Sequence, residues 1–264
     1  MILVEPGHTQ WDLKWQMLRV PVRVHPLFWL ITLAFSYDKN LKFSWVLALI
    51  GCFFVSILVH EFGHALSRRY FGDREAYVVL YQLGGLCVSP SERLQSRARI
   101  VTLLWGPGAG FILGALAYGV ELAIRYRYLP YPGDLMALVI INLVWINLLW
   151  GLFNFVPVIP LDGGQIVREY VHWKMRARGD YFAFTISFYA GLLATGVALA
   201  YFFYMTFHGG RGDGIEIRNL WPVALFGNLA YNSYVARRQI SLYGEMEDNE
   251  PRQPWQQDPD WWKK

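Results

Sequence analysis

Cysteine is nearly absent from this sequence, since Cys52 and Cys87 are the only two in 264 residues. One lies within an apolar run and the other between two such runs, so no disulfide framework is expected. The chain also contains no N-x-[ST] sequon, which is compatible with a bacterial source. Residues 1–15 lack a basic segment followed by an apolar core and a small-residue cleavage site. We therefore predict no signal peptide and expect the first membrane helix to act as the insertion signal.

Apolar residues are abundant. Hydrophobic residues make up 55% of the chain, and the mean hydropathy of +0.24 is high for a soluble domain of this length. A helix that crosses a bilayer needs about 17–25 mostly apolar residues. We predict an all-α polytopic membrane protein with about six transmembrane helices, the first of which is short unless residues 20–24 contribute. The apolar runs are 25–37, 43–66, 100–124, 135–155, 182–207 and 220–235.

Lysine and arginine are distributed unevenly between the two sides that six crossings define. Most fall in the amino-terminal segment, in 67–99, in the stretch after the fourth run and near the carboxyl end. The positive-inside rule then places both termini in the cytoplasm, and we expect a multi-pass protein of a bacterial inner or plasma membrane. This asymmetry accounts for the net charge of +4, so no nucleic-acid partner is expected. The opposite side receives only Lys39, Lys42, Arg125, Arg127, Arg211 and Arg218.

The sequence divides into three expected regions. Residues 1–24 are amphipathic and contain two tryptophans, which predicts a segment at the membrane interface. Residues 25–240 form the six-helix membrane domain, and the polar residues 241–264 favour a disordered cytoplasmic tail. The sequence from Tyr77 to Gly85 is β-branched and aromatic before a double glycine. It predicts a small strand or hairpin after the second span, in a stretch far shorter than the roughly 100 residues of a typical domain.

The second apolar run contains the pattern His60-Glu61-x-x-His64. An unpaired ionisable residue at membrane depth costs at least about 2.5–3.5 kcal/mol on insertion scales, so three of them in five residues need a compensating partner such as a metal. On a helix, His60 and His64 are spaced i, i+4 and share one face. Both imidazoles can then bind one Zn²⁺, with Glu61 beside them as a general base.

A second polar element follows the fourth apolar run, in the segment Asn154 to Gly164. Its prolines remove backbone donors and break the helix, and its two glycines permit a positive φ, so we expect Asp162 on irregular backbone. Such backbone is tolerated at membrane depth where it lines a cavity. Asp162 could then complete a set of three protein ligands with a water in the fourth position, as catalytic zinc requires.

These motifs resemble the site-2 protease family of intramembrane zinc metalloproteases, which is peptidase family M50. The resemblance is carried by HEFGH on a membrane helix, LGG after a strand, NxxPxxPLDGG after the fourth span, and VPVRVHPLFWL before the first. It covers about residues 19–175 and corresponds to a minimal form without a PDZ or CBS domain. Two positions depart from the family pattern: Gln165 follows LDGG in place of Arg, and the third span has Gly106-Pro-Gly-Ala-Gly110 in place of GPxxN.

The resemblance implies one Zn²⁺ bound by His60, His64 and Asp162, with Glu61 activating water. It implies a zinc-dependent endopeptidase that cleaves transmembrane segments of membrane proteins in regulated intramembrane proteolysis. The partners implied are a transmembrane protein substrate, a membrane-tethered regulator and the lipid bilayer. The family's six helices open the site toward the cytoplasm, in agreement with the topology derived above.

Three further residues are candidates for contact with substrate. Asn154 could hydrogen-bond the substrate backbone or the oxyanion, or it could cap the broken helix. Gly84 and Gly85 could end an edge strand, within Val78 to Leu83, that pairs with an unwound substrate. The alternative for the two glycines is a plain tight turn.

Two other functions use the same His and Asp residues. One is a membrane scaffold that binds metal without turnover, but a purely structural site needs no base such as Glu61. The other is a transporter whose intramembrane His and Asp residues form a proton or metal path. Three ligands from two places, with a base alongside, favour hydrolysis.

Overall fold

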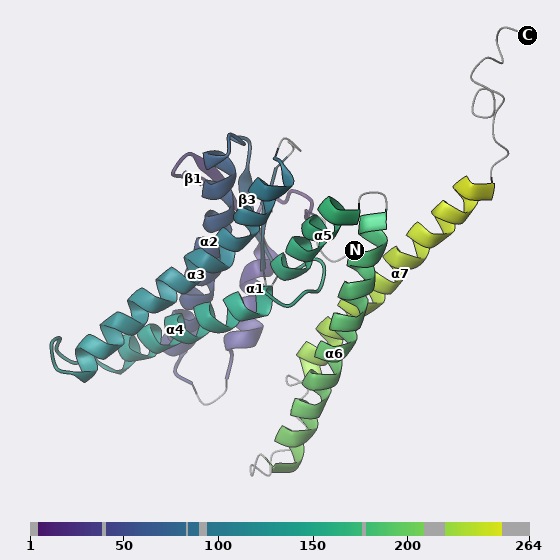
Figure 1. Cartoon of the computed structure of the whole chain (residues 1–264). Helices are drawn as coiled ribbons and strands as arrows, with labels where there is room; N and C mark the ends of the chain where they lie inside the picture. The colour runs from purple at the N-terminus through teal and green to yellow at the C-terminus, as the bar shows by residue number, and fades with distance from the viewer. Residues whose placement is uncertain are drawn as a thin grey trace, which may run out of the picture.

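The computed structural model in Figure 1 describes residues 5–38, 41–82, 84–89, 94–175, 178–208 and 220–249. Four of its helices are long and apolar enough to cross a membrane: α2 (Phe43–Tyr70), α3 (Ser96–Arg125), α4 (Asp134–Asn154) and α6 (Gly179–His208). Helix α1 (Pro26–Ser36) is apolar but has only 11 residues. Helix α7 (Trp221–Asn249) contains the sixth predicted run. The protein is mostly helical, as predicted.

A four-stranded sheet sits at one end of the helices, in the order β1-β2-β3-β4. The hairpin β3 (Tyr77–Tyr81) and β4 (Gly84–Val88) is the element expected after the second span. The hairpin β1 (Leu13–Met17) and β2 (Val20–Val24) was not predicted. Alternate residues Val20, Val22 and Val24 are buried against Phe28 and Ile57 in one apolar core. Because 20–24 forms a strand, it does not lengthen the first span.

The interior position of β3 corrects the expectation that Val78 to Leu83 offers a free edge. Strand β3 pairs in parallel with β2 and antiparallel with β4, so both of its edges are occupied. The glycines Gly84 and Gly85 begin β4 and do not end a strand. Among the described strands, β4 lies at the edge of the sheet. Residue Leu83, at the turn, lies outside the described residues.

The parallel pair β2–β3 fixes how often the chain crosses the bundle. Strand β2 precedes α1 and β3 follows α2, and Val22 lies opposite Val78. Both ends of the segment between these strands therefore lie at the same end of the molecule. Since α2 is about 42 Å long, enough to cross the roughly 30 Å of hydrocarbon, the chain from 25 to 42 must cross as well. Helix α1 covers about 16 Å of that path and begins at His25, whose side chain accepts a hydrogen bond from Leu27 N (3.2 Å).

The remaining helices form a second group. Figure 1 shows α2, α3 and α4 together, α6 beside α7, and α5 (Asp162–Met175) between the two groups. Val158 packs with Phe226 and Leu229 of α7 in a second apolar cluster, which joins the groups near α5. The tail prediction was wrong for residues 241–249, because α7 continues to Asn249. Residues 250–264 lie outside the described part of the chain.

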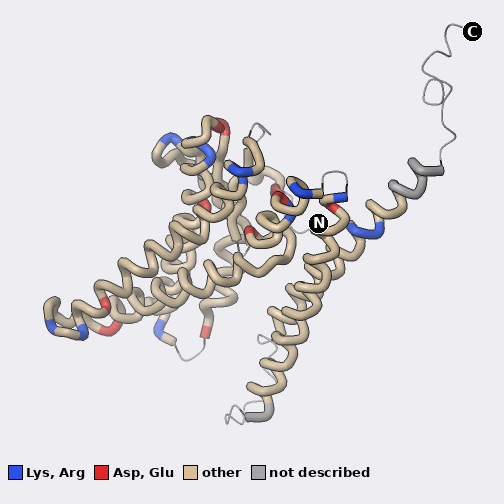
Figure 2. The backbone as a smooth tube through the Cα atoms, viewed as in Figure 1, with Lys and Arg blue, Asp and Glu red and all other residues tan. Residues whose placement is uncertain are grey.

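Basic residues gather at the end of the molecule that carries the sheet and α5, as Figure 2 shows. Some of them form ion pairs there: Arg99 Nη1 lies 3.2 Å from Glu169 Oε1, and Arg168 Nε lies 2.8 Å from Asp180 Oδ1. We refer to this as the basic end. Lys42, the N-cap of α2, and Arg125, the last residue of α3, lie at the other end of these helices, and Arg127 follows two residues after Arg125.

Candidate metal centre

Helix α2 brings His60 and His64 to one face, one helical turn apart, and buries both. The i, i+4 spacing predicted this arrangement. The Nδ1 of His64 lies 2.8 Å from the backbone oxygen of Thr102 on α3. Because that oxygen can only accept, Nδ1 carries the proton and the lone pair of the neutral ring is at Nε2. The Nε2 atom faces the other two candidate ligands.

Asp162 is the first residue of helix α5, which corrects the expectation of irregular backbone at this residue. An acidic side chain at a helix N-terminus is favoured by the helix dipole. The irregular segment instead precedes it, after α4 ends at Asn154. Gly163 and Gly164 are needed for space and not for a positive φ: a Cβ on Gly163 would overlap the oxygen of Phe155, and a Cβ on Gly164 would overlap the backbone of Val158.

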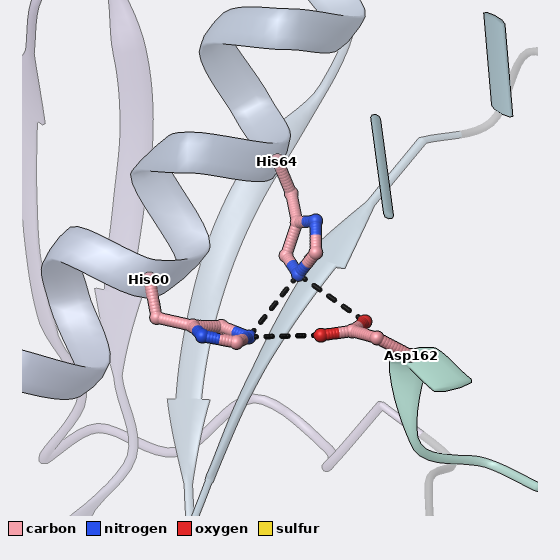
Figure 3. Close-up of side chains that lie close together, drawn as sticks. All are labelled: His60, His64 and Asp162. Atoms are coloured by element: carbon pink, nitrogen blue, oxygen red, sulfur yellow. Dashed lines mark hydrogen bonds and ion pairs between the residues drawn. The ribbon is translucent and has the colours of Figure 1, made fainter. Parts of the chain in front are cut away.

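The three side chains converge on one point (Figure 3). His60 Nε2 lies 3.2 Å from His64 Nε2 and 3.2 Å from Asp162 Oδ2, and His64 Nε2 lies 3.3 Å from Asp162 Oδ1. Two ligand atoms at about 2.0–2.1 Å from a tetrahedral Zn²⁺ lie about 3.3–3.4 Å apart. The spacing of the donor atoms therefore fits one zinc ion.

Unsatisfied polar atoms support the same fit. Asp162 Oδ2 is buried and makes no hydrogen bond with the described residues, although His60 Nε2 is close to it. A buried carboxylate oxygen without a donor is costly unless a cation lies beside it. The chemistry of the set, two imidazoles and one carboxylate, is also that of catalytic zinc sites with an open fourth position. The residues present therefore fit Zn²⁺.

Glu61 lies beside the ligands in the same cavity and is 5% exposed. Its carboxylate accepts a hydrogen bond from the backbone N–H of Cys87 on β4. A Cβ on Gly85 would overlap the Glu61 side chain, so the strand approaches this carboxylate as closely as glycine allows. Burial raises the pKa of the Cys87 thiol, which keeps it neutral and a poor metal ligand. Strand β4 thus positions Glu61 without adding a ligand.

The cavity over the ligands has a volume of about 320 Å³. Its walls come from α1, α2, β4, α3, α4, the start of α5 and α7. Gly84 and Gly85 line it, as does Asn154. The Asn154 Nδ2 donates to the oxygen of Trp150 (2.9 Å), one turn earlier on α4. The predicted catalytic, metal and substrate residues are therefore brought to one cavity.

Gly106 has a role at the ligands that sequence reasoning missed. In the sequence it stood out only as part of Gly106-Pro-Gly-Ala-Gly110, but a Cβ on Gly106 would overlap the imidazole of His64, including Nε2. Thr102, one turn earlier on α3, supplies the oxygen that fixes the His64 tautomer. The sequence showed a cluster of glycines in the third span, but a glycine cluster does not indicate which residue of another helix each glycine contacts.

Comparisons with known proteins agree with this geometry. The family model described as "Peptidase family M50" matches residues 133–207, which include Asp162. The zinc metalloprotease MJ0392 of Methanocaldococcus jannaschii is 27% identical over 162 residues, or 60% of this chain and 45% of that protein. These matches show that part of the chain is similar to peptidase family M50. The four long apolar helices α2, α3, α4 and α6, together with this similarity, support an integral membrane protein.

Two further similar proteins extend the comparison. Protein sll0528 of Synechocystis sp. is 30% identical over 171 residues, or 59% of this chain and 42% of that protein. The chain thus spans less than half the length of these two curated relatives. The structure of the site-2 protease from Methanocaldococcus jannaschii has the same fold, with a TM-score of 0.54, 19% identity, and coverage of 86% of this chain and 95% of that one.

Proposed function

We propose that this protein is a zinc-dependent endopeptidase that cleaves transmembrane segments of other membrane proteins. The observation that carries the proposal is the buried carboxylate of Glu61 beside a set of only three ligands among the described residues. A structural zinc site fills four positions with protein ligands and has no use for a base. A base next to an open position is the arrangement of hydrolytic metal sites.

The proposed reaction is hydrolysis of a peptide bond. Bound Zn²⁺ supplies a Lewis acid, which lowers the pKa of water toward about 7 and polarises the peptide carbonyl. Glu61 accepts the proton of the attacking water and delivers it to the leaving amine. The Cys87 N–H holds the Glu61 carboxylate in place while it does so. His64 stays oriented through Thr102.

The substrate enters the cavity in an extended form. A peptide bond within a helix is enclosed by its own turn and side chains, so the segment must unwind locally before that bond can reach the buried ligands. An unwound segment needs partners for its backbone, and strand β4 offers them. The backbone N–H of His25 donates to the oxygen of Leu80, so the backbone groups of Leu80 point toward β2. Gly85 lies opposite Leu80 in the antiparallel pair, so the backbone groups of Gly85 point away from β3, toward the free edge of β4. The backbone of Gly85 would thus receive the substrate by strand addition, while Gly84, whose backbone faces Tyr81 of β3, would line the cavity beside it.

Asn154 is proposed to contact the substrate as well. One N–H of its amide is used by the Trp150 oxygen, and an amide nitrogen has two. The second can donate to a carbonyl of the substrate. The basic end, where the cavity lies, is proposed to face the cytoplasm of a bacterial cell, with both termini on that side. A membrane-tethered regulator is proposed as a further partner.

The test is cleavage of a model transmembrane peptide by the purified full chain in detergent micelles, with zinc measured on the same samples. Glu61→Gln should lower kcat by about 10²- to 10⁴-fold and keep one zinc per chain, because the base is lost and the ligands remain. Asp162→Ala should lose both cleavage activity and bound zinc, because it removes a proposed ligand. Near-normal turnover by Glu61→Gln would exclude hydrolysis by this base, and zinc flux into vesicles without cleavage would indicate a transporter.

Strand addition has its own test on the substrate side. A peptide N-methylated at a single residue near the cut lacks one backbone donor and should be cleaved more slowly than its parent when that donor pairs with β4. In the matched control, the peptide is N-methylated one residue further along, where the N–H that is removed points away from β4. Equal cleavage of all three peptides would exclude pairing with β4 at Gly85.

A further inference from the structure

A second cavity lies between α2 and α3 and shares no lining residue with the metal cavity. Its volume is about 680 Å³. We name it the α2–α3 groove. Among the described residues that line it there is no acidic one, and its walls are almost entirely apolar. The main wall residues are Leu58, Phe62 and Leu66 of α2 with Val101, Trp105 and Ala109 of α3.

The groove has the length of one bilayer leaflet. It runs along α2 from Leu58 to Tyr70, a rise of about 18 Å, against about 15 Å for half of the hydrocarbon thickness. Both helices that form it are long and apolar enough to cross the membrane. The occupant of such a groove in a membrane is a hydrocarbon chain.

The tip of the β1–β2 hairpin covers the end of the groove that lies at the basic end. Leu18 and Arg19 form this tip with φ angles of 50° and 63°, a left-handed conformation that favours glycine or asparagine in such turns. Arg69 of α2 holds the tip in place by donating to the backbone oxygens of Leu18 and Arg19. As a result Leu18 lines the groove and the side chain of Arg19 is exposed beside it.

A second exposed cation lies in line with the groove. Arg97 is one helical turn before Val101 on α3, in the same i, i+4 row as Val101, Trp105 and Ala109. Arg19 and Arg97 therefore stand at the mouth of an apolar slot, one on the hairpin and one on the helix. This combination matches a molecule with a long hydrocarbon chain and an anionic head.

We propose that the α2–α3 groove binds an anionic phospholipid, with an acyl chain between the two helices and the phosphate at Arg19 and Arg97. The site is separate from the metal centre and does not depend on the proposed proteolysis. The bound lipid fills the space under the hairpin tip and thereby supports the strained turn at Leu18 and Arg19.

Native mass spectrometry of the full chain tests this proposal. Protein in micelles is mixed with equal amounts of phosphatidylglycerol and phosphatidylethanolamine, and the retained lipid is counted. The wild type should retain phosphatidylglycerol at least fivefold over phosphatidylethanolamine. Arg19→Gln with Arg97→Gln should bring this ratio close to one. The matched control, Arg125→Gln with Arg127→Gln at the opposite end, should leave the ratio unchanged.

Two further measurements keep the result decisive. Leu66→Trp, which fills the groove from a half-exposed position, should reduce retention of both lipids, and the zinc content reports whether each variant is folded. A wild-type ratio near one, or an unchanged ratio in the Arg19 and Arg97 variant, would overturn the proposal. A dimer mass without retained lipid would show that a second copy of the chain fills the groove.

Discussion

Two sides of helix α2 have opposite packing. On the side of His60, Glu61 and His64, neighbouring backbone comes so close that only glycine fits, at Gly85 and Gly106. On the side of Leu66 and Tyr70, the helix borders a groove of about 680 Å³. One helix thus carries a tightly enclosed polar face and an apolar face that is open except at Gly63, where a Cβ would overlap the backbone oxygen of Trp105. The difference shows that ligand and base geometry here depends on backbone contacts, because glycine has no side chain that could shift.

The largest effect is expected from Gly106→Ala. The added methyl overlaps the His64 imidazole and must displace a metal ligand or move α3. Zinc affinity should fall by about 10- to 100-fold or more, as for other changes that disturb ligand orientation, and cleavage should fall with it. Zinc titration of the purified variant measures this. Leu66→Ala, on the groove side, is the control and should leave zinc affinity unchanged; equal losses in both variants would contradict the contrast between the two faces.

A more selective effect is expected from Gly85→Ala. Here the methyl overlaps the Glu61 side chain, while the three ligands are untouched. Cleavage should fall by about 10²-fold or more with one zinc per chain retained, since a misplaced base loses most of its contribution. Together, Gly85→Ala and Gly106→Ala distinguish the effect of displacing the base from the effect of displacing a ligand on the same face of α2. Loss of zinc in Gly85→Ala would mean that β4 supports the ligands and not only the base.

The smallest effect is expected from a change that touches neither face of α2. The side chain of Asp12 is buried beside Arg23, with its Oδ2 3.1 Å from Arg23 Nη1. Burial acts to raise the pKa of Asp12, but hydrogen bonds from Thr9 and Arg23 outweigh it and lower the pKa to about 2. A lowered pKa in the folded state stabilises the protein above the ordinary value of 3.8, and this stabilisation is lost as the pH falls to about 2.

Asp12→Asn should therefore lower Tm at pH 7 by a few degrees and by less below pH 3.8. Thermal denaturation of both proteins across this pH range measures the difference. Zinc content should not change, because the network of Asp12 and Arg23 makes no contact with the ligands. A Tm difference that is the same at pH 7 and near pH 2 would show that the charge of Asp12 contributes nothing.

The metal set was predictable because its pattern is local. The i, i+4 spacing of His60 and His64 places both on one face of any helix that forms there. Asp162 follows the end of a helix, which the prolines before it predicted. The positions of Gly85 and Gly106 were not predictable in the same way. Their partners, Glu61 and His64, come from other elements, and no periodicity within a segment shows which neighbour a small residue faces.

The sheet shows the same limit. Alternation of Val20, Val22 and Val24 was visible in the sequence, yet the segment was interpreted as interfacial because its tryptophans dominated the pattern. The error about β3 as a free edge followed directly. A hairpin after the second span has two free edges when it is considered alone. Pairing with a strand distant in the sequence, here β2, determines which of the two edges is occupied. Periodicity within the tail likewise did not indicate that α7 runs on to Asn249.

The parallel pairing of β2 with β3 also sets an order of events during synthesis. Val22 leaves the ribosome long before Val78, and two helices must be inserted before the strands can meet. At about 5–20 residues per second, β2 waits on the order of several seconds with one edge unpaired. A substitution that delays insertion of α2 would lengthen this interval and expose β2 to aggregation. Completion of the sheet thus marks the moment at which the first two crossings have succeeded.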